Sequence, residues 1–211
     1  PGEHKWIMVD IGVTFADDTL PGIDLIYPDP GFITDKKDDL LGIVLTHAHE
    51  DHVGAVPYLW PLLQCPIYTN RFTAEILRRK LAEFGMLHRV PIVVMETNDR
   101  RQIGPFNVQW LALTHSIPDP NALMIRTPVG NIFHSGDWKL DAQPVVGPLT
   151  AQAALQALGR AGVDVVIGDS TNATERGHSR SEGDLFAGLA DHVHNAQGRV
   201  LIACFGSNVA R

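Results

Sequence analysis

Several apolar segments of this chain run directly into a histidine or an aspartate, and this arrangement constrains the fold more than any other feature. Segment 41–46 leads into His47, segment 111–114 leads into His115, and a third apolar segment ends shortly before Asp137. Such short apolar runs are typical of buried β-strands, and helical periodicity separates several of them. The alternation predicts an α/β layered architecture in which strand ends bring these polar residues together.

The same patterns place the individual elements. A long loop rich in Asp, Pro and Gly is expected over 13–39. Asn70 is expected to cap a helix over 71–84, which Gly85 closes. The other expected strands are 6–9, 66–68, 92–95, 106–114, 122–127, 131–135, 163–168 and 199–205. The other expected helices are 55–63, 151–161 capped by Thr150, and 182–195 beginning from a Ser181-Glu182-Gly183-Asp184 capping box.

The densest group of potential metal ligands is the stretch 46–52, Thr-His-Ala-His-Glu-Asp-His. Imidazole nitrogens and carboxylate oxygens are donors that first-row divalent metals accept. In an extended segment His47 and His49 point to one side, so both can reach one cation. Asp51 and His52 follow after the chain turns, which suits a second cation. The alternative is a solvated polar loop, but the interleaved acids and the buried strand before them favour a metal site.

Two later strand ends carry residues of the same kind. His115 ends one apolar segment, and Asp137 follows Gly136, which allows close backbone approach. A carboxylate can bridge two divalent cations with one oxygen for each, so Asp137 is a candidate bridging ligand. His134 should point away from the site because side chains alternate along a strand, and we expect it to pack or to support the ligands.

Composition limits the class of protein. The chain has 211 residues, 45% of them hydrophobic and 19% charged, as in ordinary globular domains. Its net charge of −7 by itself argues against a nucleic-acid-binding protein, which usually has a basic face. No apolar run approaches the ~20 residues that span a bilayer, so we expect no membrane contact. Only Cys65 and Cys204 are present, which favours a reducing cytoplasm, and we expect both to be small core residues.

These residues resemble the metallo-β-lactamase fold superfamily of binuclear hydrolases, whose first motif continues to a glycine, here Gly54. The chain is more similar still to the β-CASP branch, and within it to the ribonuclease J-like group. The stretches that narrow the resemblance are 10–13 (Asp-Ile-Gly-Val), 20–24 (Leu-Pro-Gly-Ile-Asp), 115–119 (His-Ser-Ile-Pro-Asp), 134–141 (His-Ser-Gly-Asp-Trp-Lys-Leu-Asp) and 168–173 (Gly-Asp-Ser-Thr-Asn-Ala). The resemblance spans essentially the whole chain and implies the αββα sandwich of that superfamily.

The resemblance also implies two metal sites that share a carboxylate, with zinc as the expected metal and manganese as the alternative. Asp10 matches an acidic residue that organises the metal loop through hydrogen bonds. Asp169 matches a carboxylate beside the catalytic centre, and the implied catalytic residues are Asp51, Asp137 and Asp169. The implied ligands are His47, His49 and His115 for one metal, Asp51 and His52 for the other, and Asp137 between them.

The implied activity is hydrolysis of RNA phosphodiester bonds, endonucleolytic, 5′-exonucleolytic or both. A hydroxide held between two divalent cations roughly 3.5–4 Å apart would attack phosphorus in line. The alternatives are a hydrolase of a small ester, thioester or lactam on the same core, and an inactive partial scaffold. Stretch 168–173 favours the nuclease because the small-molecule relatives lack it.

RNA is therefore the expected partner, and a homo-oligomer of a longer parent is left open. Arg176 and Arg180 flank the loop after the β-CASP carboxylate, where cations could meet the RNA backbone. Ser116 follows a proposed ligand directly and is a further candidate for substrate contact. His192 and His194 are expected to be surface residues, because positions i and i+2 on a helix do not face each other.

The expected domain boundary lies at residue 168. Residues 1–168 are expected to form the metallo-β-lactamase-type core without its first strands and its C-terminal part, and 169–211 to begin an inserted β-CASP domain. The chain begins at Pro1 and both ends look cut. We therefore expect a partial chain of a longer nuclease, which lacks the downstream histidine that completes the metal site in the family.

Overall fold

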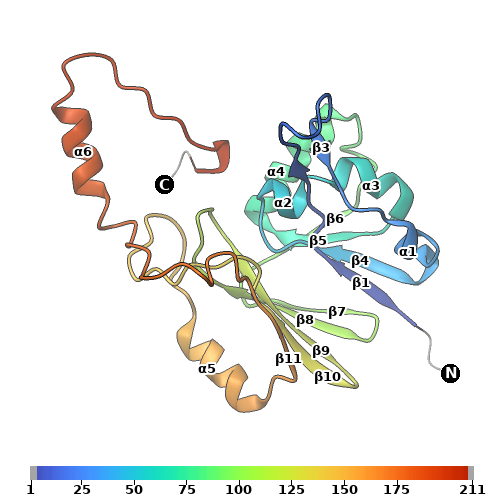
Figure 1. The fold of residues 1–211 in the computed structure, drawn as a ribbon. Helices are drawn as coiled ribbons and strands as arrows, with labels where there is room; N and C mark the ends of the chain where they lie inside the picture. The colour runs from blue at the N-terminus through green and yellow to red at the C-terminus, as the bar shows by residue number, and fades with distance from the viewer. Residues whose placement is uncertain (1–3, 209–211) are drawn as a thin grey trace.

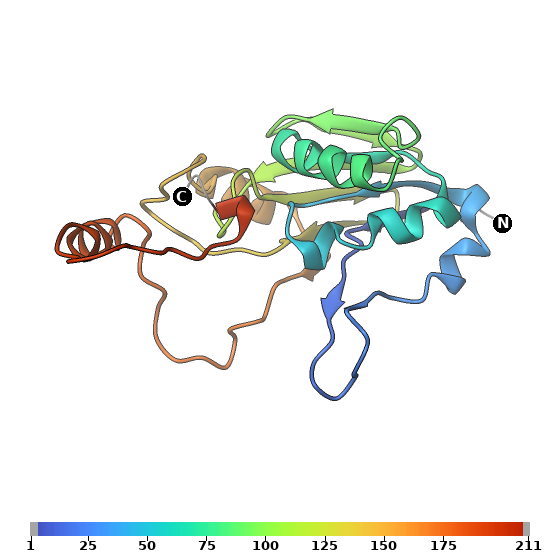
Figure 2. The same ribbon diagram turned by 90° about the horizontal axis from the view of Figure 1, so that it is seen from above.

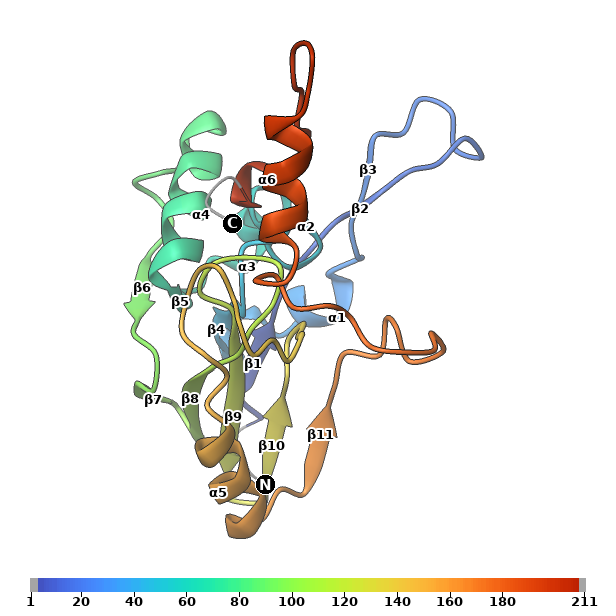
Figure 3. The ribbon, with the colours of Figure 1, turned by 90° about the vertical axis from the view of Figure 1, so that its left-hand side faces the viewer.

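Two β-sheets pack face to face at the centre of the molecule, and helices cover their outer sides (Figures 1 and 3). The computed structural model describes residues 4–208. The first sheet has the strand order β1-β4-β5-β6, and the second has the order β11-β10-β9-β8-β7. This is the αββα sandwich that the sequence predicted.

The strands of the first sheet are all parallel, whereas those of the second are antiparallel except for the β10–β11 pair. The strands are β1 (Trp6–Val9), β4 (Leu40–Val44), β5 (Ile67–Asn70), β6 (Ile92–Met95), β7 (Arg100–Ile103), β8 (Phe106–Ala112), β9 (Asn121–Thr127), β10 (Gly130–His134) and β11 (Val165–Ile167). The helices are α1 (Gly31–Thr34), α2 (Glu50–Val53), α3 (Val56–Leu63), α4 (Arg71–Glu83), α5 (Gln152–Ala161) and α6 (Phe186–His194). A small hairpin, β2 (Thr14–Phe15) and β3 (Leu25–Ile26), and the 3-10 turns Lys37–Asp39 and Gly206–Asn208 complete the elements.

Apolar side chains fill three layers, one on each side of the two sheets and one between them. On β4, Ile43 packs with α3 and α4, and its neighbour Val44 packs between the sheets. On β8, Trp110 belongs to the layer between the sheets and Leu111 to the layer that contains Leu158 of α5. Because both faces are buried, β4 and the last three residues of β8, 110–112, are continuous apolar runs.

The predicted helix after residue 70 is confirmed. The Asn70 side chain accepts a hydrogen bond from Thr73 N at 2.8 Å, which satisfies one of the free amides in the first turn of α4. The helix ends at Glu83, and Gly85 follows with a φ of +64°, a conformation that glycine adopts without strain.

The predicted caps of α5 and α6 are wrong because their side chains have other partners. The N-cap of α5 is Ala151, and the hydroxyl of Thr150 accepts a hydrogen bond from Thr114 N at 3.1 Å instead. Helix α6 begins only at Phe186 and has no side-chain cap. The proposed capping-box residue Glu182 instead accepts a hydrogen bond from the backbone of the loop after β10, at 3.0 Å.

The strand predicted over 199–205 is also wrong. Its backbone is irregular, Leu201 is 94% exposed, and Cys204 is exposed rather than in the core, whereas Cys65 is buried as expected. Among the described residues no strand pairs with this segment, so its apolar side chains have no sheet to pack on. Figure 2 shows α6 apart from the two sheets. Within residues 4–208, no helix is long and apolar enough to cross a membrane.

Candidate metal centre

A cluster of imidazole and carboxylate groups lies where β4, β8 and β10 end. His47 and His49 follow β4, His115 follows β8, and Asp137 follows β10. His47 Nε2 lies 3.0 Å from His49 Nδ1, and His115 Nε2 lies 3.2 Å from the same atom. The four residues each offer one ligand atom within 4.8 Å of the others, so one cation could contact them all.

A second group adjoins the first and shares one residue with it. Asp51 and His52 lie on α2, and together with Asp137 they offer ligand atoms within 4.8 Å of one another. His52 Nε2 lies 3.6 Å from Asp51 Oδ2 and 3.3 Å from Asp137 Oδ1. The structure therefore brings together all six residues that the sequence proposed as ligands, and Asp137 lies between the two groups.

The protonation states of the histidines in the first group, as well as their positions, suit a divalent metal ion. His47 is only 1% exposed, and burial together with the neighbouring histidines holds its pKa well below the usual range. Burial and the nearby His49 lower the pKa of His115 to about 4. Both imidazoles are therefore neutral at pH 7, and neutral imidazole nitrogens are the form that binds metals.

Asp10 determines which ring nitrogens face the cluster. Its carboxylate accepts hydrogen bonds from Thr46 N, from Thr46 Oγ1 and from His52 Nδ1, each at 2.7 Å. The Thr46 hydroxyl has a single proton, which it donates to Asp10, so it accepts from His47 Nδ1 at 3.0 Å. The lone pair of His47 is thus on Nε2, which faces the other ligands. This is the supporting role that the resemblance implied for Asp10.

His52 differs from the other histidines in its charge. Burial lowers its pKa, but hydrogen bonds with Asp10 and Asp137 outweigh this effect and raise it to about 10. The hydrogen bond from His52 in turn lowers the pKa of Asp137. Without a cation, His52 therefore carries a proton on the nitrogen that faces Asp137. A metal ion that binds the second group has to displace this proton.

Two glycines allow backbone segments to meet at the cluster. A Cβ atom at Gly12 would lie 1.7 Å from the carbonyl oxygen of Asp51, so no side chain fits between the segment after β1 and α2. Gly136 has a φ of +57°, and a Cβ atom there would lie 3.2 Å from Thr46 Cβ. A larger residue at either glycine would therefore push apart two segments that meet at the ligands.

His134 is the last residue of β10 and belongs to neither ligand group. This agrees with the expectation that its side chain points away from the ligands. Its Nδ1 accepts a hydrogen bond from Gly136 N at 3.1 Å, and burial lowers its pKa. A neutral His134 thus supports the turn that carries Asp137.

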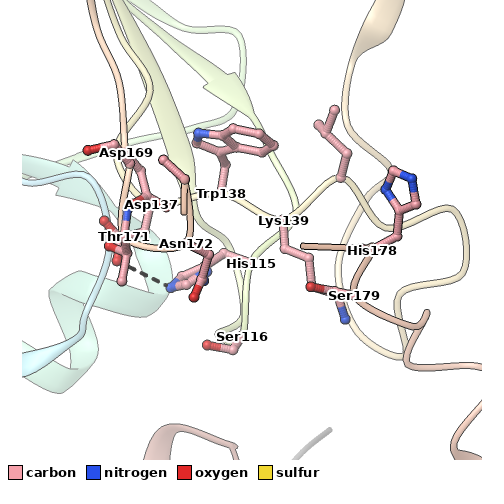
Figure 4. Close-up of a pocket in the computed structure, with 14 residues that line it drawn as sticks. His115, Ser116, Asp137, Trp138, Lys139, Asp169, Thr171, Asn172, His178 and Ser179 are labelled. Atoms are coloured by element: carbon pink, nitrogen blue, oxygen red, sulfur yellow. Dashed lines mark hydrogen bonds and ion pairs between the residues drawn. The ribbon is translucent and has the colours of Figure 1, made fainter. Parts of the chain in front are cut away.

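A cavity of about 660 Å³ opens beside the centre (Figure 4). His115, Ser116, Asp137 and Asp169 lie on its wall, which residues 138–140, 170–173 and 177–179 complete. Figure 4 shows Asp137 and Asp169 on the same side of this cavity. The backbone N–H of Asp169 donates to the Ser135 hydroxyl at 3.0 Å, which ties this residue to the end of β10.

Of the three residues proposed for substrate contact, Ser116 lines a cavity, whereas Arg176 and Arg180 lie outside the cavity walls. A second cavity of about 620 Å³ lies on the α2 side and is lined by His49, Asp51 and residues 205–208, among others. Ser116 lines both cavities. Arg176 and Arg180 are exposed and flank 177–179 of the first cavity, but they are not among its lining residues. The exposed His192 and His194 lie on α6, as predicted.

Thr46 is a functional residue that the sequence analysis did not assign. Its amide and hydroxyl contact Asp10, and its carbonyl oxygen accepts hydrogen bonds from Asn121 N and Asn70 Nδ2, both at 3.2 Å. The available signal was its position directly before His47, at the end of a buried strand. A polar residue there has to find partners within the fold.

The sequence of this chain is similar to those of known proteins. The sequence model of the Metallo-beta-lactamase superfamily matches residues 2–205. The chain is 46% identical to Ribonuclease J of Sinorhizobium meliloti over 100% of its own length and 37% of that protein, and 43% identical to Ribonuclease J of Corynebacterium glutamicum over 99% of its length and 29% of that protein. It therefore spans less than two fifths of these relatives.

A solved structure has a similar fold despite low sequence identity. A protein of unknown function from Enterococcus faecalis aligns with a TM-score of 0.58 at 18% identity, over 90% of this chain and 52% of that chain. The likeness supports the sandwich fold alone, whereas the family match rests on nearly every residue of the sequence. This chain belongs to the metallo-β-lactamase superfamily.

Proposed function

We propose that the protein containing this chain is a metal-dependent ribonuclease that hydrolyses RNA phosphodiester bonds, internally, from the 5′ end, or both. The observation that carries the proposal is the 36–46% identity to ribonucleases J over 97–100% of this chain. The aligned region includes both ligand groups and the cavity beside them. The alternative, a hydrolase of small esters, thioesters or lactams, has no comparable support.

Two divalent metal ions are the proposed cofactors. Bound there, they would supply an activated water and offset the negative charge that develops on the phosphate oxygens. Zinc suits the first group, which has three imidazoles, and manganese is the alternative for the second, which has two carboxylates. The proposed ligands are His47, His49 and His115 in the first group, Asp51 and His52 in the second, and Asp137 in both.

Asp51 is the proposed proton acceptor. Its side chain is 65% exposed and lies 3.6 Å from His52, so it can take a proton at the centre and pass it to solvent. Asp137 and Asp169 are the other proposed catalytic residues, because their carboxylates line the cavity beside His115 and can orient the attacking water.

Ser116 is proposed to contact RNA because it lines both cavities, one on each side of the centre. Arg176 and Arg180 are proposed to neutralise phosphates that leave the first cavity. We further propose that 1–168 is the catalytic core and that 169–211 begins an inserted domain. In support, α6, which follows β11, lies apart from both sheets (Figure 2).

The test is cleavage of 5′-monophosphorylated RNA by the full protein, with Zn²⁺ or Mn²⁺ and after chelation, alongside a thioester and a lactam substrate. We expect RNA cleavage that is lost on chelation and restored by added metal. Hydrolysis of the thioester or the lactam without cleavage of RNA would overturn the proposal.

A further inference from the structure

Asn70 connects two loops that carry proposed metal ligands. It is the last residue of β5, it is 1% exposed, and α4 begins at the next residue. With no loop residue between strand and helix, its side chain lies at the same end of the first sheet as the turn after β4. The helix cap accounts for only one atom of this side chain.

The helix fixes the orientation of the carboxamide. Asn70 Oδ1 accepts from Thr73 N at 2.8 Å, and because a backbone N–H can only donate, this atom has to be the oxygen. The amide nitrogen therefore points the other way, where it donates to Thr46 O at 3.2 Å and to Asp119 O at 2.6 Å. Both amide protons and the oxygen have a partner.

The two carbonyl groups that accept these hydrogen bonds belong to separate ligand loops. Thr46 directly precedes His47, and Asp119 lies in the β8–β9 loop, which also carries His115. Asp119 has a φ of +57° and stands before a proline, a combination that is unfavourable for a residue with a side chain. Its carbonyl therefore depends on outside donors to remain in place.

Asn121 provides the only other hydrogen bond to this carbonyl that we identify within residues 4–208, from its Nδ2 at 3.0 Å. Asn121 lies in the same loop region as Asp119, at the start of β9, so it cannot tie that loop to another element through this contact. Its backbone N–H also donates to Thr46 O, at 3.2 Å. The Asn70 carboxamide differs because it reaches both carbonyls, Asp119 O and Thr46 O, from a third segment, the junction of β5 and α4.

We propose that Asn70 is a positioning residue, whose amide holds the His115 loop against the His47 turn so that both imidazoles reach one cation. The proposal rests on the proposed metal-dependent function. A residue that merely caps α4 would leave metal binding unchanged when another good cap replaces it.

Two substitutions separate these roles. Asn70→Ser and Asn70→Asp both keep a side chain that caps helices well, and both remove the two amide donors. Asn70→Asp also places a carboxylate oxygen against two carbonyl oxygens, so it should have the larger effect. Thr69→Val is the matched control, because it removes a buried hydrogen bond from the adjacent β5 residue to Leu45 O, at 3.1 Å, and leaves the Asn70 amide with both of its acceptors.

The measurement is Zn²⁺ affinity of the full protein by competition with a chromophoric chelator, after thermal unfolding has shown which variants are folded. We expect the first Zn²⁺ to bind about 10-fold more weakly in Asn70→Ser, and more weakly still in Asn70→Asp, as for other residues that support ligands. In the metal-free protein, amide hydrogen exchange in the β8–β9 loop should be faster in both variants than in Thr69→Val.

Native Zn²⁺ affinity in either folded Asn70 variant overturns the proposal, as does an equal loss in Thr69→Val. A native protein that binds Zn²⁺ but does not cleave RNA refutes the ribonuclease function alone, since the affinity comparison still decides the role of Asn70. A native protein that does not bind Zn²⁺ refutes both.

Discussion

The Asp10 carboxylate and His52 Nδ1 lie 2.7 Å apart, although 42 residues separate them in the sequence. Because Nδ1 of His52 donates to Asp10, the opposite nitrogen faces Asp51 and Asp137. The same carboxylate holds Thr46, which orients His47. A single side chain at the end of β1 therefore controls one imidazole in each ligand group.

Replacing Asp10 with Asn should weaken metal binding. The amide group would present a donor where the carboxylate has two acceptors, which favours the wrong tautomer of His52. We expect a loss of about 10–100-fold in metal affinity, measured by chelator competition. Asp24→Asn, at an exposed position of the β2–β3 hairpin, is the control and should retain native affinity. Equal affinity in both variants would contradict this role.

Binding of the second metal should release a proton. His52 has a pKa of about 10 in the metal-free protein, so near neutral pH it is protonated and has to lose that proton to bind a cation. Affinity of the second group should therefore rise with pH, by up to ~10-fold per unit below that pKa. Titration calorimetry in buffers of different ionisation enthalpy measures the protons released, and a count of zero would refute the expectation.

Replacing His115 with Ala should remove the metal of the first group and abolish RNA cleavage. His115 reaches the cluster from a different sheet than His47 and His49, so no neighbouring side chain replaces it. Metal content by elemental analysis and cleavage of labelled RNA are the measurements. His192→Ala on the exposed helix α6 should change neither.

Replacing Asp51 with Asn should abolish turnover while the first metal remains bound. Asp51 belongs to the second ligand group only, and it is the proposed proton acceptor. Loss of a general base costs about 10²–10⁴-fold in rate. Single-turnover RNA cleavage and metal analysis of the same sample test both statements. Full activity in this variant would exclude Asp51 as the proton acceptor.

Replacing Gly12 with Ala should destabilise the fold. The new Cβ atom would lie 1.7 Å from Asp51 O, so the backbone has to move. Overpacking of this kind costs about 1–3 kcal/mol, which thermal or denaturant unfolding detects. Gly159→Ala is the matched control: nothing lies within 4 Å of its new Cβ, and Ala in helix α5 should stabilise by about 1 kcal/mol.

The layered α/β class and the polar residues at the strand ends could be predicted from local pattern, whereas the αββα sandwich was implied by the resemblance to a known superfamily. β4 is apolar throughout, and β8 is apolar from Trp110 to its end, so the polar residues that follow mark the strand ends. His47 and His115 each follow such a run closely. The residue types then indicated the chemistry, without knowledge of how the strands are ordered.

The contacts of Thr46 and Asn70 could not be predicted, because they depend on which strands are neighbours and in what register. The pairing of Val44 with Tyr68 brings the ends of β4 and β5 together, and no pattern within either strand determines it. The strand expected over 199–205 was wrong for a related reason. Apolar composition favours a strand, but a strand forms only with a partner, and the described residues provide none.

Three segments meet at Thr46: its amide donates to the Asp10 carboxylate, its carbonyl accepts from Asn121 N, and Gly136 packs against it. None of Asp10, Asn121 and Gly136 lines either of the two cavities. The loops that line the cavities can therefore change in sequence without moving the ligands. Relatives with this fold can therefore keep the metal ligands while the loops that line the cavities change and select other substrates.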